Sequence, residues 1–455
     1  MSQDSGTVAG MSRTELRATF SLSSVYALRM LGLFMILPVF ALYAGELEGV
    51  TPALTGLAIG AYGITQALLQ IPAGLLSDRI GRKPVIIGGL LVFAFGSVVA
   101  AQAESIYVVI LGRALQGSGA IAAAVMALTA DLTSEHHRIK AMAMIGMSIG
   151  LSFAAALILG PLLNGWVGVP GIFWITAVLA LGGVGIVAFI VPRPAALHVH
   201  REAEAVPAQF GRVLRNPELL RLDFGILVLH MVLTATFVVM PLVLRDEVGL
   251  AAEKHWGVYL PVLLASVLAM VPFIIQAERK GRVKPVFLGA VTVLVLAQAG
   301  LYLLPLTLVT VVALLFVFFA AFNLLEAMLP SMISRVAPVD CRGTAMGFYS
   351  SSQFFGAFLG GALGGLVQGW FGLQVVFAAA ALTLLLWLAM ALPMRPPRKL
   401  ANYIHKIVAL DTADAERIAR ELTRVVGVAE AVVVLEEGVA YLKVDKQLFD
   451  EAALP

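Results

Sequence analysis

The sequence predicts an all-α polytopic membrane protein with twelve transmembrane helices in two similar six-helix bundles, followed by a small α/β domain of ferredoxin-like topology. Hydrophobic residues make up 60 % of the 455 residues and charged residues 13 %, whereas a soluble domain carries roughly 25 % charge. The charge is uneven: residues 1–399 hold 25 Lys/Arg and 18 Asp/Glu (43 of 399), and residues 400–455 hold 6 and 10 (16 of 56). We therefore expect the first part to face lipid and the last part to be soluble.

The individual spans follow from runs of about 20 apolar residues, the length that crosses a bilayer. Such runs lie near residues 21–43, 54–76, 85–103, 106–130, 140–165, 171–192, 222–244, 256–277, 285–304, 306–333, 343–369 and 373–394. The longest polar gap separates the sixth and seventh runs. The predicted organisation is an N-terminus (1–20), a first bundle (21–192), a linker (193–221), a second bundle (222–395) and a soluble domain (400–455).

The cations predict the orientation, because loops on the cytoplasmic side are enriched in Lys and Arg. The N-terminus and the segments after every second span hold 21 Lys/Arg, and the opposite loops hold two, Arg245 and Lys254. Both termini are therefore expected in the cytoplasm. The pI of about 9.0 then reflects loops beside the bilayer and indicates no nucleic-acid partner.

Several other function classes find no support in the sequence. The single cysteine, Cys341, excludes an intramolecular disulfide. His198 and His200 lie in a polar loop, and no His/Cys cluster has metal-ligand spacing. There is no phosphate-binding loop for ATP and no clustered nucleophile or metal site for an intramembrane enzyme. We expect no cofactor other than a proton gradient as energy source.

The two halves repeat each other. Pro72, Asp78, Arg79, Gly81 and Arg82 recur 200 positions later as Pro272, Glu278, Arg279, Gly281 and Arg282. Transporters are often built from such repeats, with the substrate site between them near the membrane midplane. The repeat therefore favours a transporter.

Residues 74–84, GLLSDRIGRKP, match the signature of the loop between spans 2 and 3 in the major facilitator superfamily. RALQGSG (113–119) resembles its span-4 motif, and LGLFMILPV (31–39) resembles the span-1 motif of its twelve-span drug:proton antiporters, with Ala41 where a second proline is usual. The resemblance covers nearly all of the chain. The matching positions of the loop signature are Gly74, Asp78, Arg79, Gly81, Arg82 and Lys83.

The resemblance implies a transporter that works by alternating access in a bacterial inner membrane, and it further implies a proton-coupled exporter of small molecules. We expect a monomer with an unidentified small-molecule substrate. Two alternatives stay open: a proton symporter for uptake, and a sensor that has kept the fold without transport. The family also implies a contact between Arg82 and Asp131, at the end of span 4.

The loop signature is expected to act as a conformational switch. Gly81 permits a tight turn, and the carboxylate of Asp78 can accept hydrogen bonds from the start of a neighbouring helix, where the dipole favours negative charge. In the family that neighbour is span 11, which here starts near Arg342. The alternative is a solvated positively charged loop, which explains the cations but not an acid between two glycines.

Charged residues inside spans are costly and usually functional. Arg29 in span 1, Arg113 in span 4 and Glu326 in span 10 lie well inside. Arg29 would suit an anionic or hydrogen-bonding partner in the cavity. Glu326 is the best candidate for a proton carrier, and the alternative is a permanent pair with a neighbouring donor such as Asn323.

Other polar residues extend this pathway. His230 in span 7 can titrate near neutral pH or serve as a packing residue. Gln66 and Gln70 lie one turn apart in span 2, and Tyr26 shares the face of Arg29 in span 1. These three are expected either to face the cavity or to make interhelical hydrogen bonds.

Span 5 ends in GPLLNG and resembles the family's antiporter motif, with Ala156 and Asn164 in place of two glycines. The matching residues are Gly150, Gly160, Pro161 and Gly165. Glycines allow close helix packing and proline invites a bend, so the segment is either a gate or a plain packing surface.

The soluble domain is predicted to begin with a strand at 406–410, followed by a helix capped by Asp411 or Thr412. The apolar stripe of that helix contains Ala415, Ile418, Ala419, Leu422, Val425 and Val426. A hairpin at 431–444 turns at 436–438, and residues 446–453 are expected to start a second helix. We expect the domain to dock at the cytoplasmic face in a regulatory or stabilising role.

Overall fold

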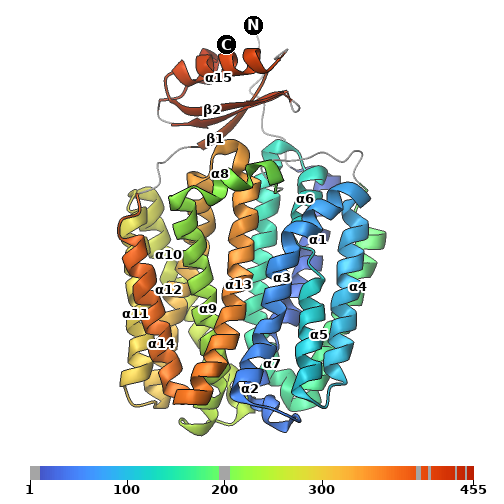
Figure 1. The fold of residues 1–455 in the computed structure, drawn as a ribbon, viewed down its shortest axis with the longest axis vertical. Coiled ribbons are helices and arrows are strands. Elements are labelled where there is room, and N and C mark those ends of the chain that lie inside the picture. The colour runs from blue at the N-terminus through green and yellow to red at the C-terminus, as the bar shows by residue number, and fades with distance from the viewer. Residues whose placement is uncertain are drawn as a thin grey trace.

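A computed structural model describes residues 11–193, 205–395, 401–407, 411–435, 438–445 and 448–454. Long helices lie side by side in two groups, and a small α/β unit sits on one end of them (Figure 1). We call this unit, residues 401–454, the tail, the adjacent end of the helices the tail end, and the other the far end. His198 and His200 lie outside the described residues.

Each group contains six membrane-crossing segments. The first group comprises α1 (Arg13–Phe34), α3 (Pro52–Ile80), α4 (Arg82–Ala101), α5 (Ile106–Ser118) with α6 (Ala122–Leu132), and α7 (Glu135–Gly185) with the π-helical turn η2 (Ile186–Ile190). The second comprises α9 (Pro217–Asp246), α10 (Trp256–Arg279), α11 (Val283–Leu303), α12 (Leu308–Val336), α13 (Arg342–Phe371) and α14 (Leu373–Ala391). Short helices connect them: α2 (Phe40–Tyr43), η1 (Ala44–Glu46), η3 (Pro207–Gln209), α8 (Phe210–Leu214), η4 (Ala252–Lys254) and η5 (Val339–Cys341).

Ten helices in the described part of the chain are long and apolar enough to cross a membrane. One of them, Lys140–Ile190, has 51 residues and would be about 76 Å long if straight. Its helix is interrupted at Gly168, where φ is +67°, so it supplies two spans. α1 is not among the ten because it carries Arg17, Arg29 and three serines, but it packs along α7 inside the first bundle. The twelve-span fold is thereby confirmed.

Several boundaries differ from the prediction. The first span was expected at 21–43, but α1 begins at Arg13, where Ser12 and Glu15 form a capping box, and it ends at Phe34. The fourth is broken between α5 and α6. α9 begins at Pro217 with Asn216 as its cap, so the end of the predicted linker is helical.

The two groups meet along α3 and α13 through glycines. A side chain at Gly60 would meet the carbonyl oxygen of Phe358 at 2.7 Å, and one at Gly56 would meet the Cα of Gly365 at 2.8 Å. Toward the tail end the packing is looser, since the nearest atoms to a side chain at Gly347 would be side-chain atoms, Cβ of Ala205 at 3.5 Å and Cγ1 of Ile71 at 3.7 Å. Such glycines allow helices to approach closely in a membrane. The halves are therefore closest toward the far end.

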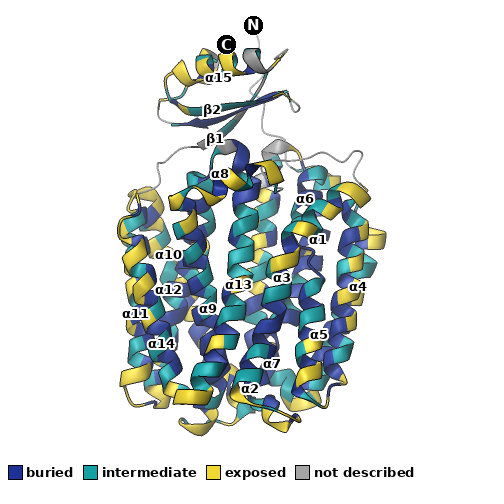
Figure 2. Cartoon of the chain, viewed as in Figure 1, coloured by how far each residue is buried: buried dark blue, intermediate teal, exposed yellow. Residues whose placement is uncertain are grey.

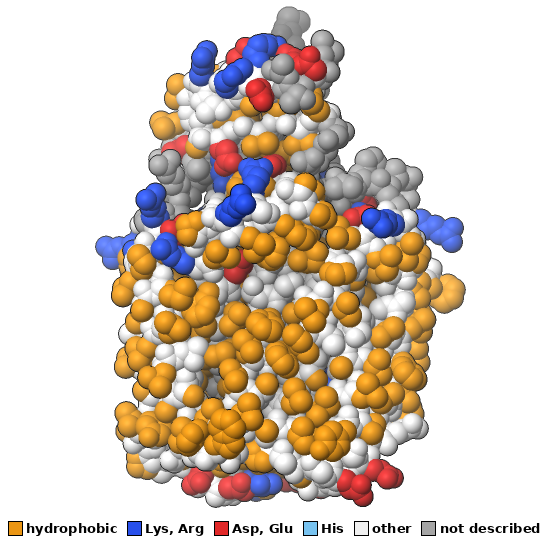
Figure 3. Space-filling model, viewed as in Figure 1, with side chains coloured by type: hydrophobic (Ala, Val, Ile, Leu, Met, Phe, Trp, Pro, Cys, Tyr) orange, Lys and Arg blue, Asp and Glu red, His pale blue; other side chains and the backbone are white. Residues whose placement is uncertain are grey.

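The surface matches a membrane setting. Exposed positions lie mainly along the outer faces and at the ends of the helices (Figure 2). Hydrophobic side chains cover the middle of the visible face, while Lys and Arg gather at the tail end (Figure 3).

The tail contains β1 (Ala401–Lys406), α15 (Thr412–Arg424), β2 (Val428–Val434), β3 (Val439–Val444) and the turn η7 (Glu451–Ala453). The sheet is antiparallel with the order β1-β3-β2, the split βαβ arrangement of ferredoxin-like domains. Leu422 of α15 and Leu442 of β3 share its core.

Three details of the tail were predicted differently. β1 occupies 401–406 rather than 406–410, and residues 408–410 lie outside the described part. Asp411 caps α15 as expected, but the helix ends at Arg424, before Val425 and Val426. Of the helix predicted at 446–453, the described residues contain only η7.

Candidate functional site

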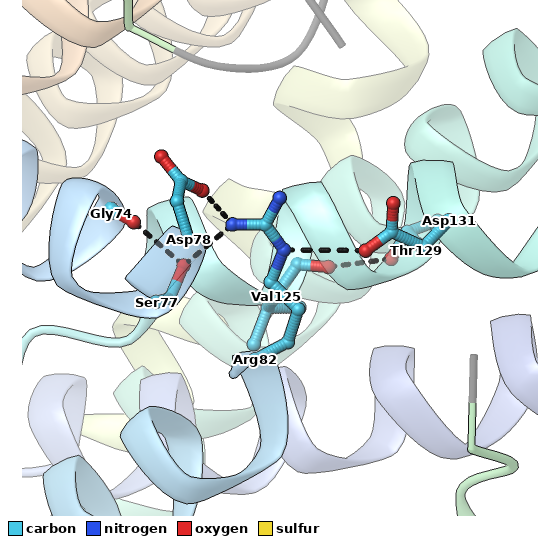
Figure 4. Close-up of polar contacts among 7 residues, drawn as sticks. All are labelled: Gly74, Ser77, Asp78, Arg82, Val125, Thr129 and Asp131. Carbon is cyan, nitrogen blue, oxygen red and sulfur yellow. Dashed lines mark hydrogen bonds and ion pairs between the residues drawn. The ribbon is translucent and has the colours of Figure 1, made fainter. Parts of the chain in front are cut away.

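The predicted switch motif forms a buried clamp at the tail end of the first half (Figure 4). Gly81 separates α3 from α4 with a φ of +100°, a conformation that glycine adopts freely. This turn lets Arg82 fold back into an ion pair with Asp78. Arg82 also donates from Nε to Oδ2 of Asp131 at 3.2 Å and from Nη1 to Oγ of Ser77 at 2.9 Å. The expected contact between Arg82 and Asp131 is therefore present.

The expected contact between Asp78 and the start of α13 is not formed. The structure pairs Asp78 with Arg82 of its own half instead. The start of α13 is engaged by the linker: the Thr344 hydroxyl donates to Oε1 of Gln209 at 2.7 Å and accepts from the Val206 amide at 2.9 Å. The physical reason is that α3 and α13 pack more loosely toward this end.

The rest of the motif lies around the clamp. A side chain at Gly74 would meet Cβ of Ala123 at 2.9 Å, so glycine is needed for close packing there. Arg79 is exposed. The Lys83 ammonium donates to the Val191 carbonyl at 2.5 Å, which joins the start of α4 to the end of the first bundle.

The second half repeats the clamp with the charges exchanged. In the first half the loop supplies the cation, Arg82. In the second half the loop supplies the acid, since both carboxylate oxygens of Glu278 accept from Nη2 of Arg335 on α12 at 2.7 Å. The side chains of Arg82 and Asp131 are at most 1 % exposed, whereas that of Glu278 is 48 % exposed. An exposed pair contributes little stability.

The first half also holds two fully buried arginines. Arg29 donates from Nη2 to Oε1 of Gln66 at 2.7 Å and to the Gly119 carbonyl at 3.0 Å. That carbonyl is available because the helix breaks between α5 and α6. The Arg29 guanidinium also lies 5.6 Å from the ring centre of Tyr62, a cation–π distance.

Arg113 is bound more completely. It donates to the carbonyls of Ala58 and Ile59 at 3.4 and 3.3 Å and to Oε1 of Gln116 at 2.8 Å. Gln116 in turn donates to Oγ of Ser97 at 2.7 Å. Arg113 therefore connects α5 to α3 directly and to α4 through Gln116, so its role in this conformation is structural.

The glutamines of α3 make interhelical and intrahelical bonds. Nε2 of Gln66 donates to Oε1 of Gln70 at 2.9 Å, and both residues are buried. Tyr26 is buried on α1, and none of the described hydrogen bonds involves its hydroxyl. Gln66, Gln70 and Tyr26 were predicted either to face the cavity or to make interhelical hydrogen bonds. In this conformation Gln66 makes an interhelical bond, to Arg29 of α1.

The second half brings Glu326 and His230 together with Gln353, a set that we call the acid–histidine cluster. Nε2 of Gln353 donates to Oε1 of Glu326 at 3.2 Å and lies 2.8 Å from Nε2 of His230. Nε2 of His230 is 3.9 Å from Oε2 of Glu326. The Glu326 side chain is 37 % accessible, yet its Oε2 and the His230 Nδ1 have no hydrogen-bond partner within the described structure.

Asn323 is not part of this cluster. Its amide donates to Oγ of Ser266 on α10 at 3.0 Å. The predicted alternative, a pair between Glu326 and a neighbouring donor, is therefore present with Gln353 and not with Asn323 as the donor. Gln353 was missed, since a single glutamine in a glycine-rich span gives no indication of the face on which it lies.

The antiporter-like segment of α7 divides into packed and open parts. A side chain at Gly160 would meet the Met35 carbonyl at 2.5 Å and Cγ of Pro38 at 2.9 Å, so Gly160 packs against the end of α1. Gly150 has open space around it and Gly165 meets Glu253 only at 3.5 Å. Pro161 lies within the helix. Close packing thus explains Gly160 but not Gly150.

The tail docks on the connection between α12 and α13. The Lys443 ammonium donates to the carbonyls of Arg335 at 3.0 Å and Ala337 at 2.5 Å, at the negative end of the α12 dipole. Burial lowers the pKa of Lys443 below its ordinary value. Arg212 of α8 pairs with Asp340 at 2.6 Å in the same connection, so linker and tail meet there.

Sequence comparison agrees with this architecture. The profile of the Major Facilitator Superfamily matches residues 22–324 and 222–407. The chain is 47 % identical over 438 residues to the inner membrane transport protein YajR of Escherichia coli (strain K12), covering 96 % of both chains. It is 25 % identical to the multidrug resistance protein MdtH of Yersinia enterocolitica, covering 75 % of this chain and 83 % of that one.

The fold is also shared with solved structures. A bacterial homolog of the human lysosomal transporter Spinster, in an inward-facing and occupied conformation, superposes with a TM-score of 0.69 at 14 % identity. The match covers 86 % of this chain and 98 % of that one. At this identity the likeness concerns the fold alone.

Proposed function

The chain belongs to the Major Facilitator Superfamily, whose members are membrane transporters and not enzymes, and we propose that it exports small molecules in exchange for protons. The observation that carries the proposal is Glu326. Its carboxyl group lies inside a span, has no cation beside it other than a protonatable His230, and leaves one oxygen unbonded within the described structure. A carboxylate inside a span without a paired cation is costly, and its side chain is 37 % accessible, so that protons can reach it. Both features favour a carboxyl group that binds and releases a proton.

Alternating access supplies the remaining steps. Glu326 and His230 lie on helices of the second half and are partly accessible, so a change in how the halves meet changes which side of the membrane reaches them. Proton binding neutralises Glu326, and substrate binding favours the deprotonated state of Glu326. The resemblance of MdtH to this chain supports export, and the open Gly150 within the antiporter-like segment is consistent with a movable helix.

The proposed setting is an inner membrane with the tail in the cytoplasm. The distribution of cations supports it, since 21 Lys/Arg belong to segments on one side and two to the other. The protein is proposed to act as a monomer on a small molecule of unidentified class.

The experiment uses everted membrane vesicles that carry the protein and a fluorescent reporter of the pH gradient. A compound library is screened for members that dissipate the gradient. We expect at least one such compound with the wild-type protein and none with Glu326→Gln. Glu247→Gln, an exposed acid at the far end of α9, is the matched control and should behave as wild type.

A result against the proposal would be a compound that the wild-type protein carries across the vesicle membrane without any change in the gradient. Equal dissipation by Glu326→Gln would assign the coupling to another group.

A further inference from the structure

A second buried carboxyl group lies in the same half, outside the acid–histidine cluster. Asp223 is on α9 and is 7 % exposed. It lies six residues from the start of the helix, about 9 Å along the axis. Its Oδ1 has no hydrogen-bond partner among the described residues. Asp223 is the second residue of the predicted span 222–244, but α9 begins at Pro217, so Asp223 lies inside the helix.

Tyr349 connects this carboxyl group with the cluster. It lies on α13, is 4 % exposed, and its hydroxyl has no hydrogen-bond partner in the described part of the chain. It lies four residues, or about one helical turn, before Gln353 of the acid–histidine cluster, and α13 packs along α9, which carries Asp223. Tyr349 lies seven residues, about 10 Å, from the start of α13 at the tail end. Glu326 lies ten residues, about 15 Å, from the end of α12 at the same side. The depth of Tyr349 is therefore between those of Asp223 and Glu326.

The surrounding elements supply no cation for Asp223 among the described contacts. α14, which packs on α9, contains no ionisable residue. On α8, Arg212 pairs with Asp340, and on α9 itself Arg221 pairs with Glu218 at 2.5 Å. α12 carries Glu326, α9 itself carries His230, and α13 carries Tyr349 as well as Arg342 at its first residue. Asp223 as a carboxylate would therefore be an uncompensated buried charge, which is strongly unfavourable.

We propose that Asp223 is a second proton-binding carboxyl group, linked to Glu326 through the Tyr349 hydroxyl, so that the second half binds two protons. The Tyr349 hydroxyl can donate to one carboxylate while it accepts from the other carboxyl group once that group is protonated. This inference rests on the proposed function, because it assumes that Glu326 exchanges protons.

The test needs no substrate. Infrared spectra of the full-length protein in lipid nanodiscs are recorded through a pH titration, and the C=O stretch of protonated carboxyl groups is followed. We expect two buried carboxyl bands that disappear as the pH rises. Asp223→Asn should remove one and Glu326→Gln the other, while Tyr349→Phe should keep both bands and shift their frequencies. Asp246→Asn, an exposed acid on the same helix paired with Arg245, and Tyr302→Phe, an exposed tyrosine, are the controls.

Two results would overturn the inference: spectra of Asp223→Asn that equal wild type at every pH, or an Asp223 band that persists unchanged to alkaline pH and so marks a permanently protonated group. If Asp223→Asn does not fold, Asp223→Glu gives the same information, because its band should move rather than vanish. The proposed function fails separately, when Glu326→Gln loses its band yet keeps transport coupled in vesicles.

Discussion

The two halves share a scaffold but differ in the charges that they bury. The first half buries Arg29 and Arg113. Arg113 donates to Gln116 and to two backbone carbonyls, whereas Arg29 donates from Nη2 and leaves Nε and Nη1 without a partner in the described structure. The second half holds Asp223, His230 and the partly accessible Glu326, each of which also keeps one polar atom without a partner there. A guanidinium group keeps its charge in a protein, whereas an unpaired carboxyl or imidazole group can change its protonation state. We therefore expect the Arg113 network to stabilise the first half, and we propose that the carboxyl groups of the second half bind protons.

The clamps at the tail end show the same division. The Arg82–Asp131 pair is buried and the Arg335–Glu278 pair is largely exposed. The first is therefore expected to hold the first half as one body. The second is free to respond to the tail, because Lys443 bonds to the carbonyl of Arg335.

The largest expected effect breaks the arginine network. Arg113→Ala should lower the free energy of unfolding by roughly 2–4 kcal/mol, because it leaves a cavity and an unpaired Gln116 side chain. Glu326→Gln should change it by less than about 1 kcal/mol, since an acid without a cation partner becomes a neutral group of the same shape. Denaturation of the purified variants in detergent measures both. If Glu326→Gln proves more destabilising than Arg113→Ala, the assignment of stability to the first half and proton binding to the second is wrong.

The next effect concerns the switch motif. Asp78→Asn should slow transport about tenfold or more while stability stays within about 1 kcal/mol, because the Asp78 side chain is partly exposed. Asp131→Asn should instead destabilise the protein, since it removes the carboxylate from the buried Arg82. Transport and melting temperature are measured side by side, with exposed Glu46→Gln as the control. Wild-type transport by Asp78→Asn would leave the motif with a structural role only.

The smallest effect concerns the tail. Cys341 is buried in η5, which contacts β2 and β3 of the tail, and burial raises the pKa of its thiol to about 11 from 9.0. Its thiolate fraction near neutral pH is therefore about a hundredfold lower than usual. Maleimide labelling should be slow and should rise as the pH approaches 11.

Removing the tail tests the same contact. A chain ending at Lys399 should still fold, and its Cys341 should label roughly tenfold faster as the thiol becomes exposed. Lys443→Met should give a smaller increase, because the sheet remains beside η5. Aggregation of the shortened chain would show instead that the tail is an integral part of the fold.

Most of the fold could be predicted from the sequence because a span requires a long apolar segment. The turn at Gly81 was predictable because glycine adopts a positive φ freely. Boundaries were less predictable. α1 begins among polar residues that its capping box makes helical, and β1 is the mixed segment ANYIHK rather than the more apolar KIVAL. Both depend on contacts with other elements that composition does not report.

The ionisable residues of the site were predicted from the sequence, but the residues that contact them were not. Glu326 is conspicuous because charge inside a span is rare. Gln353 and Tyr349 are ordinary span residues until the rotation of α13 places them against α9 and α12. Asp78 differs for another reason: its partner depends on how closely the halves approach, which belongs to the conformation and not to the motif.

One measurement tests the central claim most directly. The Glu326→Gln variant and the wild-type protein are reconstituted in proteoliposomes with a compound identified in the vesicle screen. Exchange of labelled for unlabelled compound is measured without a pH gradient, and accumulation is measured with one. The account predicts that the variant keeps exchange within about twofold and loses gradient-driven accumulation at least tenfold, because the halves still move but no proton is carried. Accumulation by Glu326→Gln at the wild-type level would contradict it.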